Sequence, residues 1–279
     1  MMAKDSGLRR LGHLPNQARL SASMPHLETH QFICRSDNYG LLVHDHQSGA
    51  TASVDAPDAA AIERELKKRG WQLTHIFTTH HHIDHVEGNL QLKEHYDCII
   101  IGPKAEADRI PGIKKEVSGG EIFEWAGRDV RVYACPGHTR GHIAYSIPSE
   151  FLLFAADTLF SLGCGRVFEG TLEEMYHSVN QFKALSHETY VYCGHEYTES
   201  NARFALSVEP GNQALQQRAD VVASLRKEGK MTCPTTIGDE LKTNPFLRCG
   251  SIEIRRNLNM EGASEAEVFA ELRRRKDNF

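Results

Sequence analysis

The 279-residue sequence lacks several features that mark particular classes of protein. It has no run of 18 or more apolar residues, so we expect neither a transmembrane helix nor a membrane partner. Its formal net charge of −5 argues against a nucleic-acid partner, although a local basic patch could still bind an acidic small molecule. It has no Gly-x-Ser-x-Gly motif, the usual signature of a serine hydrolase of the α/β type. What remains is an ordinary globular composition, with 40% hydrophobic and 25% charged residues.

The cysteines also lack a regular pattern. There are seven, an odd number, and no Cys-x-x-Cys spacing occurs among them. Such a set fits reduced, mostly structural thiols in a reducing compartment, so we expect the protein to be cytoplasmic. Cys164 and Cys193 adjoin segments of the candidate site described below, but a small residue packed in a tight turn is the interpretation that we favour for both.

Residues 1–24 differ in composition from the rest of the chain. They contain four basic residues, one acidic residue and only a weak apolar pattern. A mitochondrial presequence is basic and poor in acidic residues in this way, whereas a secretory signal needs an apolar core that is absent here. The alternative is an upstream start, with Met24 as the first residue of the protein. In both cases we expect residues 1–25 to form a disordered extension.

Two patterns divide the remaining chain. In residues 26–197, short apolar runs that predict strands alternate with helical segments. One helix is expected at 59–69, because Gly70 follows it as a favoured C-terminal residue. After residue 197 the chain reads as helices at 198–207, 212–228 and 264–276, with a loop at 231–247. We predict an α+β protein with a sheet-containing domain at 26–197 and a smaller helical domain at 198–279.

The most informative motif runs from Thr79 to His85 and reads Thr-His-His-His-Ile-Asp-His. It follows a short β-rich segment, and the ends of strands are where sites usually lie in sheets with helices on their faces. Imidazole and carboxylate are ligands for zinc and neighbouring first-row metals. Two histidines at i and i+2 in a loop can converge on one ion, and the Asp–His pair after them can turn toward a second ion.

Three later residues complete a possible ligand set. His138, Asp157 and His195 each lie just past a β-like run, with glycine or other small residues nearby. Taken singly, each is more simply interpreted as a structural residue. Together with the four ligands of the first motif they make seven, the number that two metal ions sharing one carboxylate require.

At this point the chain resembles the metallo-β-lactamase superfamily and, within it, the glyoxalase II or hydroxyacylglutathione hydrolase family. The patterns Thr-His-x-His-x-Asp-His and Pro-Gly-His-Thr-x-Gly-His are matched at 79–85 and 136–142. Four patterns of the narrower family are matched at 163–171, 192–198, 244–248 and 273–279. The resemblance covers the chain from about residue 28 to the end. It implies an αββα sandwich followed by the smaller helical domain.

The resemblance assigns a role to each candidate residue. The first metal ion would be held by His80, His82 and His138, the second by Asp84, His85 and His195, and both by Asp157. Asp84 and Asp157 are the expected catalytic residues. We expect two divalent ions per chain, with zinc preferred and iron or manganese as alternatives. The expected glutathione contacts are Arg166, Phe168, Tyr197, Arg273 and Lys276. The family often has tyrosine where Phe168 stands, and a phenyl ring can pack against a substrate but cannot donate a hydrogen bond.

The implied activity is hydrolysis of S-(2-hydroxyacyl)glutathione thioesters, typically S-D-lactoylglutathione, to glutathione and a 2-hydroxy acid. A hydroxide held between two metal ions would attack the thioester, in the final step of methylglyoxal detoxification. Arginine and lysine suit the two carboxylates of glutathione, although the charge pattern alone would make Arg273 and Lys276 a solvated helix face. We expect a monomer whose partner is this small molecule.

Two other hypotheses stay open at this stage. Another reaction of the superfamily, such as that of a glutathione persulfide dioxygenase or a lactonase, could use a similar site, and a dioxygenase would need one iron ion. Alternatively, the metals could be structural and the protein a binding module. Structural zinc sites are usually closed and rich in cysteine, which this His/Asp set is not.

Overall fold

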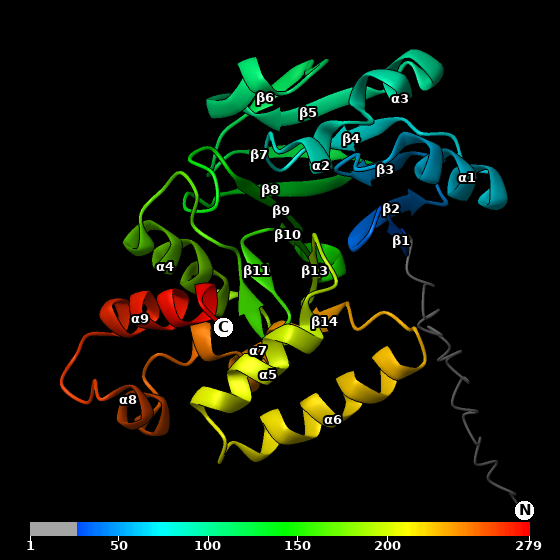
Figure 1. Cartoon of the computed structure of the whole chain (residues 1–279). Helices are drawn as coiled ribbons and strands as arrows, with labels where there is room; N and C mark the ends of the chain where they lie inside the picture. The colour runs from blue at the N-terminus through cyan, green and yellow to red at the C-terminus, as the bar shows by residue number, and fades with distance from the viewer. Residues whose placement is uncertain (1–26) are drawn as a thin grey trace, which may run out of the picture.

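The computed structural model describes residues 27–279, so the expectations for residues 1–25 lie outside the described part of the chain. Two six-stranded sheets lie at the centre of the described part, with helices on both sides of the pair (Figure 1). Among residues 27–279, no helix combines the length and the apolar character that crossing a membrane requires.

The first sheet contains β1 to β6 in chain order. The bounds of its strands are Leu27–Cys34 (β1), Asn38–Asp45 (β2), Thr51–Val54 (β3), His75–Phe77 (β4), Ile99–Pro103 (β5) and Lys115–Val117 (β6). β1 to β3 pair antiparallel, and β3 to β6 pair parallel. Helices α1 (Ala59–Arg69) and α3 (Asn89–Tyr96) cover its outer face, where Leu66 and Ile76 belong to one buried cluster.

Helix α1 has the bounds that the sequence predicts. At its N-terminus, the carboxylate of Asp58 accepts a hydrogen bond from the N–H of Ala61. At its C-terminus, Gly70 adopts the left-handed conformation, with φ 71°, and its N–H bonds to carbonyls of the last turn. The predicted end of the helix at Gly70 is therefore confirmed.

The second sheet has the strand order β14-β13-β10-β9-β8-β7. The bounds of its strands are Ile122–Trp125 (β7), Arg128–Ala134 (β8), Ile143–Ile147 (β9), Leu152–Ala156 (β10), Tyr190–Cys193 (β13) and Thr235–Thr236 (β14). β10 and β13 are parallel, and the other neighbours are antiparallel. The two sheets pack face to face across a buried cluster that includes Phe77 of the first sheet and Tyr145 and Phe154 of the second. A small hairpin of β11 (Leu159–Phe160) and β12 (Gly163–Cys164) follows β10.

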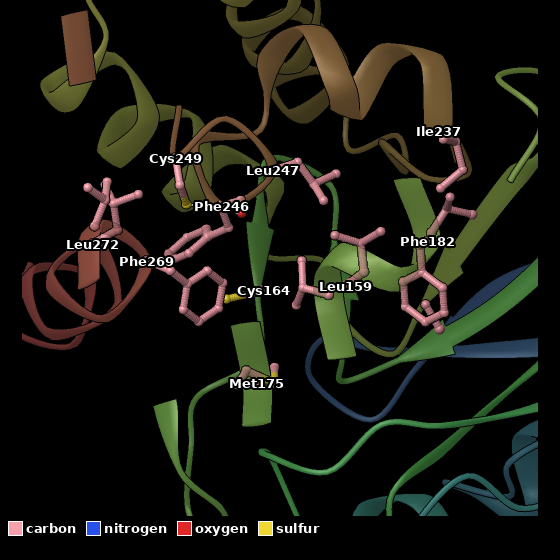
Figure 2. Close-up of a cluster of buried hydrophobic side chains, with 14 of the residues drawn as sticks. Leu159, Cys164, Met175, Phe182, Ile237, Phe246, Leu247, Cys249, Phe269 and Leu272 are labelled. Carbon is pink, nitrogen blue, oxygen red and sulfur yellow. Dashed lines mark hydrogen bonds between the residues drawn. The ribbon is translucent and has the colours of Figure 1, made fainter. Parts of the chain in front are cut away.

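Helices cover the outer face of the second sheet. They are α4 (Leu172–Asn180), α5 (Thr198–Val208), α7 (Ile237–Thr243), α8 (Ile252–Leu258) and α9 (Glu265–Asp277), whereas α6 (Gln213–Lys227) packs on α5. One buried cluster joins Met175 and Phe182 to Phe246, Phe269 and Leu272 of the C-terminal part (Figure 2). Burying each of these side chains stabilises the fold by about 1.5–3 kcal/mol, so the C-terminal helices are held firmly against the sandwich. The predicted αββα sandwich followed by a smaller helical domain is confirmed.

The segment 231–247 differs from the loop that the sequence predicts. Thr235 and Thr236 form the edge strand β14, which pairs antiparallel with β13. Thr236 then caps α7 by accepting a hydrogen bond from the N–H of Asp239. The loop prediction was wrong there because the strand is only two residues long and is stabilised by pairing with a distant strand, which leaves no local periodic pattern.

Candidate metal centre and substrate pocket

Four loops at strand ends carry the seven predicted ligands. The segment after β4, which includes the short helix α2 (Ile83–Val86), carries the first four. His138 lies between β8 and β9, Asp157 directly follows β10, and His195 lies just beyond β13. An antiparallel bridge between Asn38 and His195 joins the two sheets at this edge, which brings the loops together.

The first predicted ligand group is His80, His82 and His138. Its candidate ligand atoms lie within 4.8 Å of one another. Nδ1 of His82 and Nε2 of His138 are 3.0 Å apart, which suits two nitrogens at about 2.0–2.1 Å from one ion. Burial and neighbouring histidines lower the pKa of His80 and lower that of His82 to about 4, so both rings are neutral and present lone pairs.

The second predicted group is Asp84, His85 and His195, whose candidate ligand atoms also lie within 4.8 Å of one another. Asp157 faces both groups. Its Oδ2 is 3.4 Å from Nε2 of His138 and 3.4 Å from Nε2 of His195, and its Oδ1 is 3.6 Å from Nε2 of His85. The side chain of Asp157 is thus placed where a carboxylate shared by two ions would be.

Three atoms of these groups test whether the site fits metal ions. Nε2 of His80, Nε2 of His85 and Oδ1 of Asp157 are buried, and within residues 27–279 they have no hydrogen-bond partner. Buried polar atoms in proteins almost always have a partner. All three belong to residues whose candidate ligand atoms lie close together, so a bound cation is the partner that the donor set fits. His142 stacks on His80 with ring centroids 4.7 Å apart, but it belongs to neither group.

In three of the ligand histidines, the ring nitrogen that faces away from the centre contacts an oxygen atom of a supporting residue. Nδ1 of His85 lies 2.7 Å from Oδ2 of Asp55, and Nδ1 of His195 lies 2.8 Å from Oδ1 of Asp37. Nδ1 of His138 lies 2.8 Å from the carbonyl oxygen of Arg166. Such contacts orient a ligating imidazole and leave its Nε2 free for the metal.

Carboxylates dominate the electrostatics around the second ligand group, whose two histidines have raised pKa values. Burial alone would lower the pKa of His85, but the charges of Asp157 and Asp55 outweigh it and raise the pKa. Burial would also lower the pKa of His195, but Asp157 and two further carboxylates outweigh it and raise this pKa to about 9. Burial opposes ionisation of Asp157 itself, yet the surrounding histidines hold its pKa well below the ordinary value. A site that stabilises protons this strongly also favours a dication, which would replace them.

A cavity of about 570 Å³ opens onto the centre. Ligand residues line one end of it: His82, Asp84, His138, Asp157 and His195. All five predicted glutathione contacts line it as well: Arg166, Phe168, Tyr197, Arg273 and Lys276. The structure therefore brings every predicted substrate residue next to the candidate metal centre, while the role of each remains a prediction.

Arg273 and Lys276 differ in how many contacts within the protein already hold their side chains. Arg273 is only 4% exposed, and its Nη1 donates a hydrogen bond of 2.7 Å to the carbonyl oxygen of Cys164. It also pairs with Asp277, which accepts a further bond from Arg166. Part of the role of Arg273 is therefore to anchor α9 to β12. Within residues 27–279, the Nζ atom of Lys276 donates hydrogen bonds only to Ser200, and the residue lines the cavity.

Comparisons with known proteins agree with this geometry. The family model described as metallo-beta-lactamase superfamily matches residues 50–195, and the model described as hydroxyacylglutathione hydrolase C-terminus matches residues 196–279. A protein of Rhizobium meliloti (strain 1021) named hydroxyacylglutathione hydrolase is 56% identical over 256 residues, which are 92% of this chain and 100% of the relative. The chain belongs to the hydroxyacylglutathione hydrolase family. A member from Brucella anthropi is 55% identical over 93% of this chain and 100% of its own length.

Solved structures support the fold. ETHE1 from Myxococcus xanthus matches with a TM-score of 0.63 at 23% identity, over 88% of this chain and 90% of that chain. The BLEG-1 B3 metallo-beta-lactamase matches with a TM-score of 0.59 at 19% identity, over 79% of this chain and 99% of that chain.

Sequence reasoning missed the carboxylates behind the histidines. Asp55 directly follows β3, as the predicted ligands follow other strands, and this position was the one signal that could have identified it. It accepts hydrogen bonds from the N–H and the hydroxyl of Thr79 as well as contacting His85. Asp37 lies in the turn between β1 and β2, where an aspartate is common for local reasons.

Asp55→Asn is expected to weaken binding of the second metal ion about ten- to hundredfold. An amide has one acceptor oxygen and a donor group, so it cannot make all three contacts of the carboxylate. Competition with a chromogenic chelator measures the affinity. Asp45→Asn is a matched control, because Asp45 is also buried, lies at the far end of β2 and pairs with Arg128 rather than with a ligand. Unchanged affinity in Asp55→Asn would contradict the role that we assign to Asp55.

Proposed function

We propose that the protein hydrolyses S-(2-hydroxyacyl)glutathione thioesters, typically S-D-lactoylglutathione, to glutathione and a 2-hydroxy acid. The observation that carries this proposal is that one cavity joins the seven-residue candidate metal centre to a cationic end with Arg166, Arg273 and Lys276. Glutathione has two carboxylates, which these cations can pair with. The relatives named hydroxyacylglutathione hydrolase match over their whole length, which supports the same reaction.

The chain's own residues bind and orient the substrate. The cations hold the glutathione part, and burial together with nearby carboxylates raises the pKa of Tyr197, so its hydroxyl stays protonated and can donate to the substrate. Two divalent ions, when bound, make a water molecule acidic enough to attack near neutral pH and stabilise the charge that develops on the thioester carbonyl. Asp84 and Asp157 place carboxylates at this point.

No side chain of the pocket is suited to act as the nucleophile itself. Cys164 lines the cavity, but burial raises its pKa to about 11, so the thiol stays protonated at neutral pH. A thiolate leaving group, with a reference pKa near 8.5 for a thiol, needs no strong acid to depart. The residues therefore fit hydrolysis by water rather than a covalent enzyme intermediate.

Thioester hydrolysis by purified, metal-loaded protein tests the proposal. We expect turnover of S-D-lactoylglutathione that is lost when a chelator removes the metal, with the fold largely retained. Elemental analysis of the same sample separates the alternatives, because a dioxygenase would hold one iron ion per chain and consume oxygen. No turnover of the thioester together with turnover of a lactone or a persulfide would refute the proposal.

Several finer points are further proposals. We propose zinc for both sites, because a nitrogen and oxygen donor set suits it, with iron or manganese as alternatives. We propose a monomer. We propose the cytoplasm as the location of the protein, because all seven cysteines are free and buried.

We also propose the division into domains near residue 197, which the meeting of the two family models at 195 and 196 supports.

Phe168→Tyr is expected to lower KM a fewfold, by about 0.5–1.5 kcal/mol of added hydrogen bonding, with little change in kcat. Phe168 is 60% exposed, lines the cavity and lies edge-on to His138, with ring centroids 5.2 Å apart. A phenol at this position adds a donor without moving the ring. Steady-state kinetics with lactoylglutathione measure the effect, and Phe168→Leu serves as a control that removes the ring. A Phe168→Tyr protein with an unchanged or higher KM would contradict the prediction.

The KM for an acidic thioester is expected to rise as the pH rises through about 8. Burial and then the neighbouring Arg273 and Arg203 lower the pKa of Lys276 to about 8. Below that pH the ammonium is charged and can pair with a glutathione carboxylate, and above it the attraction is lost. Kinetics from about pH 6.5 to 9.5 measure the profile, because this range brackets the lowered lysine pKa. Lys276→Arg keeps its charge over the range and should flatten the rise, whereas a wild-type KM that stays flat would contradict the assignment.

A further inference from the structure

Glu106 connects the two loops that carry the histidines of the first ligand group. It lies in the 3-10 helix η1 (Lys104–Arg109), which directly follows β5, and it is only 3% exposed. One of the loops follows β4 and carries His80 and His82, with the second-group ligands Asp84 and His85 after them in α2. The other lies between β8 and β9 and carries His138.

Each carboxylate oxygen of Glu106 accepts two hydrogen bonds from one loop. Oε2 accepts from the backbone N–H of His81 at 2.8 Å and contacts Nδ1 of the same residue at 2.7 Å. Oε1 accepts from the hydroxyl of Thr139 at 2.5 Å and from the N–H of Gly141 at 2.8 Å. His81 lies between two ligands of one loop, and Thr139 follows the ligand His138 of the other. The carboxylate therefore fixes the backbone beside all three histidines.

The loop with Gly141 approaches Glu106 closely, and donors occupy all acceptor sites of the carboxylate. A Cβ atom at Gly141 would lie 2.5 Å from Cγ of Glu106, so this loop can approach the carboxylate only with glycine at that position. A carboxylate offers about four acceptor sites, and four donors already occupy those of Glu106. It therefore has no lone pair left for a cation, although His81 and Glu169 are near it, and it acts on the metal centre only through the loops.

The second ligand group is held by different residues. Asp55 contacts His85, Asp37 contacts His195, and the side chain of Asn38 donates to Asp84. Among the contacts of Glu106 in the described chain, none is to a residue of that group. Asp55 also accepts hydrogen bonds from Thr79, beside the first-group ligand His80, so it supports both groups, whereas every contact of Glu106 is to a residue beside a first-group ligand. Glu106 is therefore the residue through which the affinity of the first ion can be changed on its own.

We infer that Glu106 is a positioning residue that sets the spacing of His80, His82 and His138 and so the affinity of the first metal ion. The inference rests on the metal-dependent function proposed above. Glu106 does not touch substrate or metal, and its effect is selective for one of the two ions. Loss of a supporting contact of this kind typically weakens metal binding ten- to hundredfold.

Glu106→Gln provides the test, because glutamine keeps the size of the side chain and has one acceptor oxygen in place of two. The purified full-length protein is stripped of metal and titrated with Zn²⁺ against a chromogenic chelator, which gives an affinity for each of the two ions. We expect one ion to bind about ten- to hundredfold more weakly than in the wild type and the other to bind within about twofold. Two ions at wild-type affinity, or an equal loss of both, would overturn the inference.

Two further variants complete the test. Glu240→Gln is a matched control, because Glu240 is fully buried and accepts bonds from Ser161, Leu162, Thr235 and Asn244, away from the ligand loops. We expect it to lower the melting temperature and leave both zinc affinities unchanged. Thr139→Val removes one bond to Glu106 and serves if Glu106→Gln does not fold. It should weaken the same single ion a fewfold, and unchanged binding of that ion would overturn the inference.

The zinc titration and the thioester assay test the role of Glu106 and the proposed function separately. If the wild-type protein binds two ions but does not cleave lactoylglutathione, the proposed substrate is wrong, and the comparison of zinc affinities still tests Glu106. If the wild type is active and Glu106→Gln binds both ions normally, the proposed function stands and the inference on Glu106 is overturned.

Discussion

Asp157→Asn is expected to abolish hydrolysis almost completely and to lower the metal content of the protein. Asp157 is 5% exposed and lies between the two ligand groups, within 3.6 Å of nitrogens of His85, His138 and His195. The surrounding histidines hold its pKa well below the ordinary value, so the wild-type side chain is ionised at any working pH. The substitution removes this charge from between the two ligand groups, where the proposed ions would bind, and its amide group would direct hydrogens at them.

Elemental analysis and steady-state kinetics of Asp157→Asn measure these two effects, with circular dichroism to check the fold. Asp129→Asn is the matched control. Asp129 is exposed on β8, so this substitution removes the same charge at a distance from the centre. We expect the control to keep both ions and full activity. An Asp157→Asn protein that holds two ions and turns over thioester at nearly the wild-type rate would show that the carboxylate is not shared between them.

Sequence reasoning identified the ligand residues through two kinds of signal, the spacing within a motif and the position after a strand. His80, His82 and Asp84 stand close together in an unusual order, and the spacing itself is informative. His138 is informative because it lies inside the family pattern at 136–142, whereas Asp157 lies in none of the quoted patterns and its one signal is that it directly follows a strand-like run. A short motif can be recognised in this way because its residues converge within one loop, before any tertiary structure is considered.

The supporting carboxylates could not be found in the same way. Glu106 is 25 residues from His81 and 33 from Thr139 in the sequence, and the contact depends on how β5 is placed beside β4 in the first sheet. Asp37 reaches His195 across 158 residues and between the two sheets. Single acidic residues are common in loops and carry no spacing signal, so only the strand order reveals their partners. The same reason explains why β14 was missed.

More of the fold than of the supporting carboxylates could be predicted from the sequence. Helix ends such as the Asp58 cap and Gly70 of α1 are local signals, and they predict boundaries well. The face-to-face packing of the sheets is not local, and the sequence indicated it through the family resemblance rather than through periodicity. The shared core of Phe182 and Phe246 likewise follows from tertiary packing (Figure 2).

Arg273→Ala combined with Lys276→Ala is expected to raise KM strongly and to leave kcat nearly unchanged. Both side chains line the cavity without belonging to either ligand group, and they lie about one turn apart on α9. Their contacts to a glutathione carboxylate should be similar in the ground state and the transition state, and the loss of such uniform binding appears in KM. Two contacts to a charged group, at about 1.5–3 kcal/mol each and discounted for exposure, predict about a tenfold to several-hundredfold loss in kcat/KM.

The buried position of Arg273 adds a second expected effect. Its bond to the carbonyl oxygen of Cys164 is lost in the double variant, so the melting temperature should fall, and assays must be run well below it. Arg274→Ala with Arg275→Ala is the control, because these neighbours on α9 pair with Glu271 outside the cavity and should leave KM unchanged. Metal content should be that of the wild type in both proteins. If the Arg273 and Lys276 double variant kept a wild-type KM, these cations would be a structural and solvated part of α9, and the glutathione carboxylates would have to be held elsewhere in the cavity.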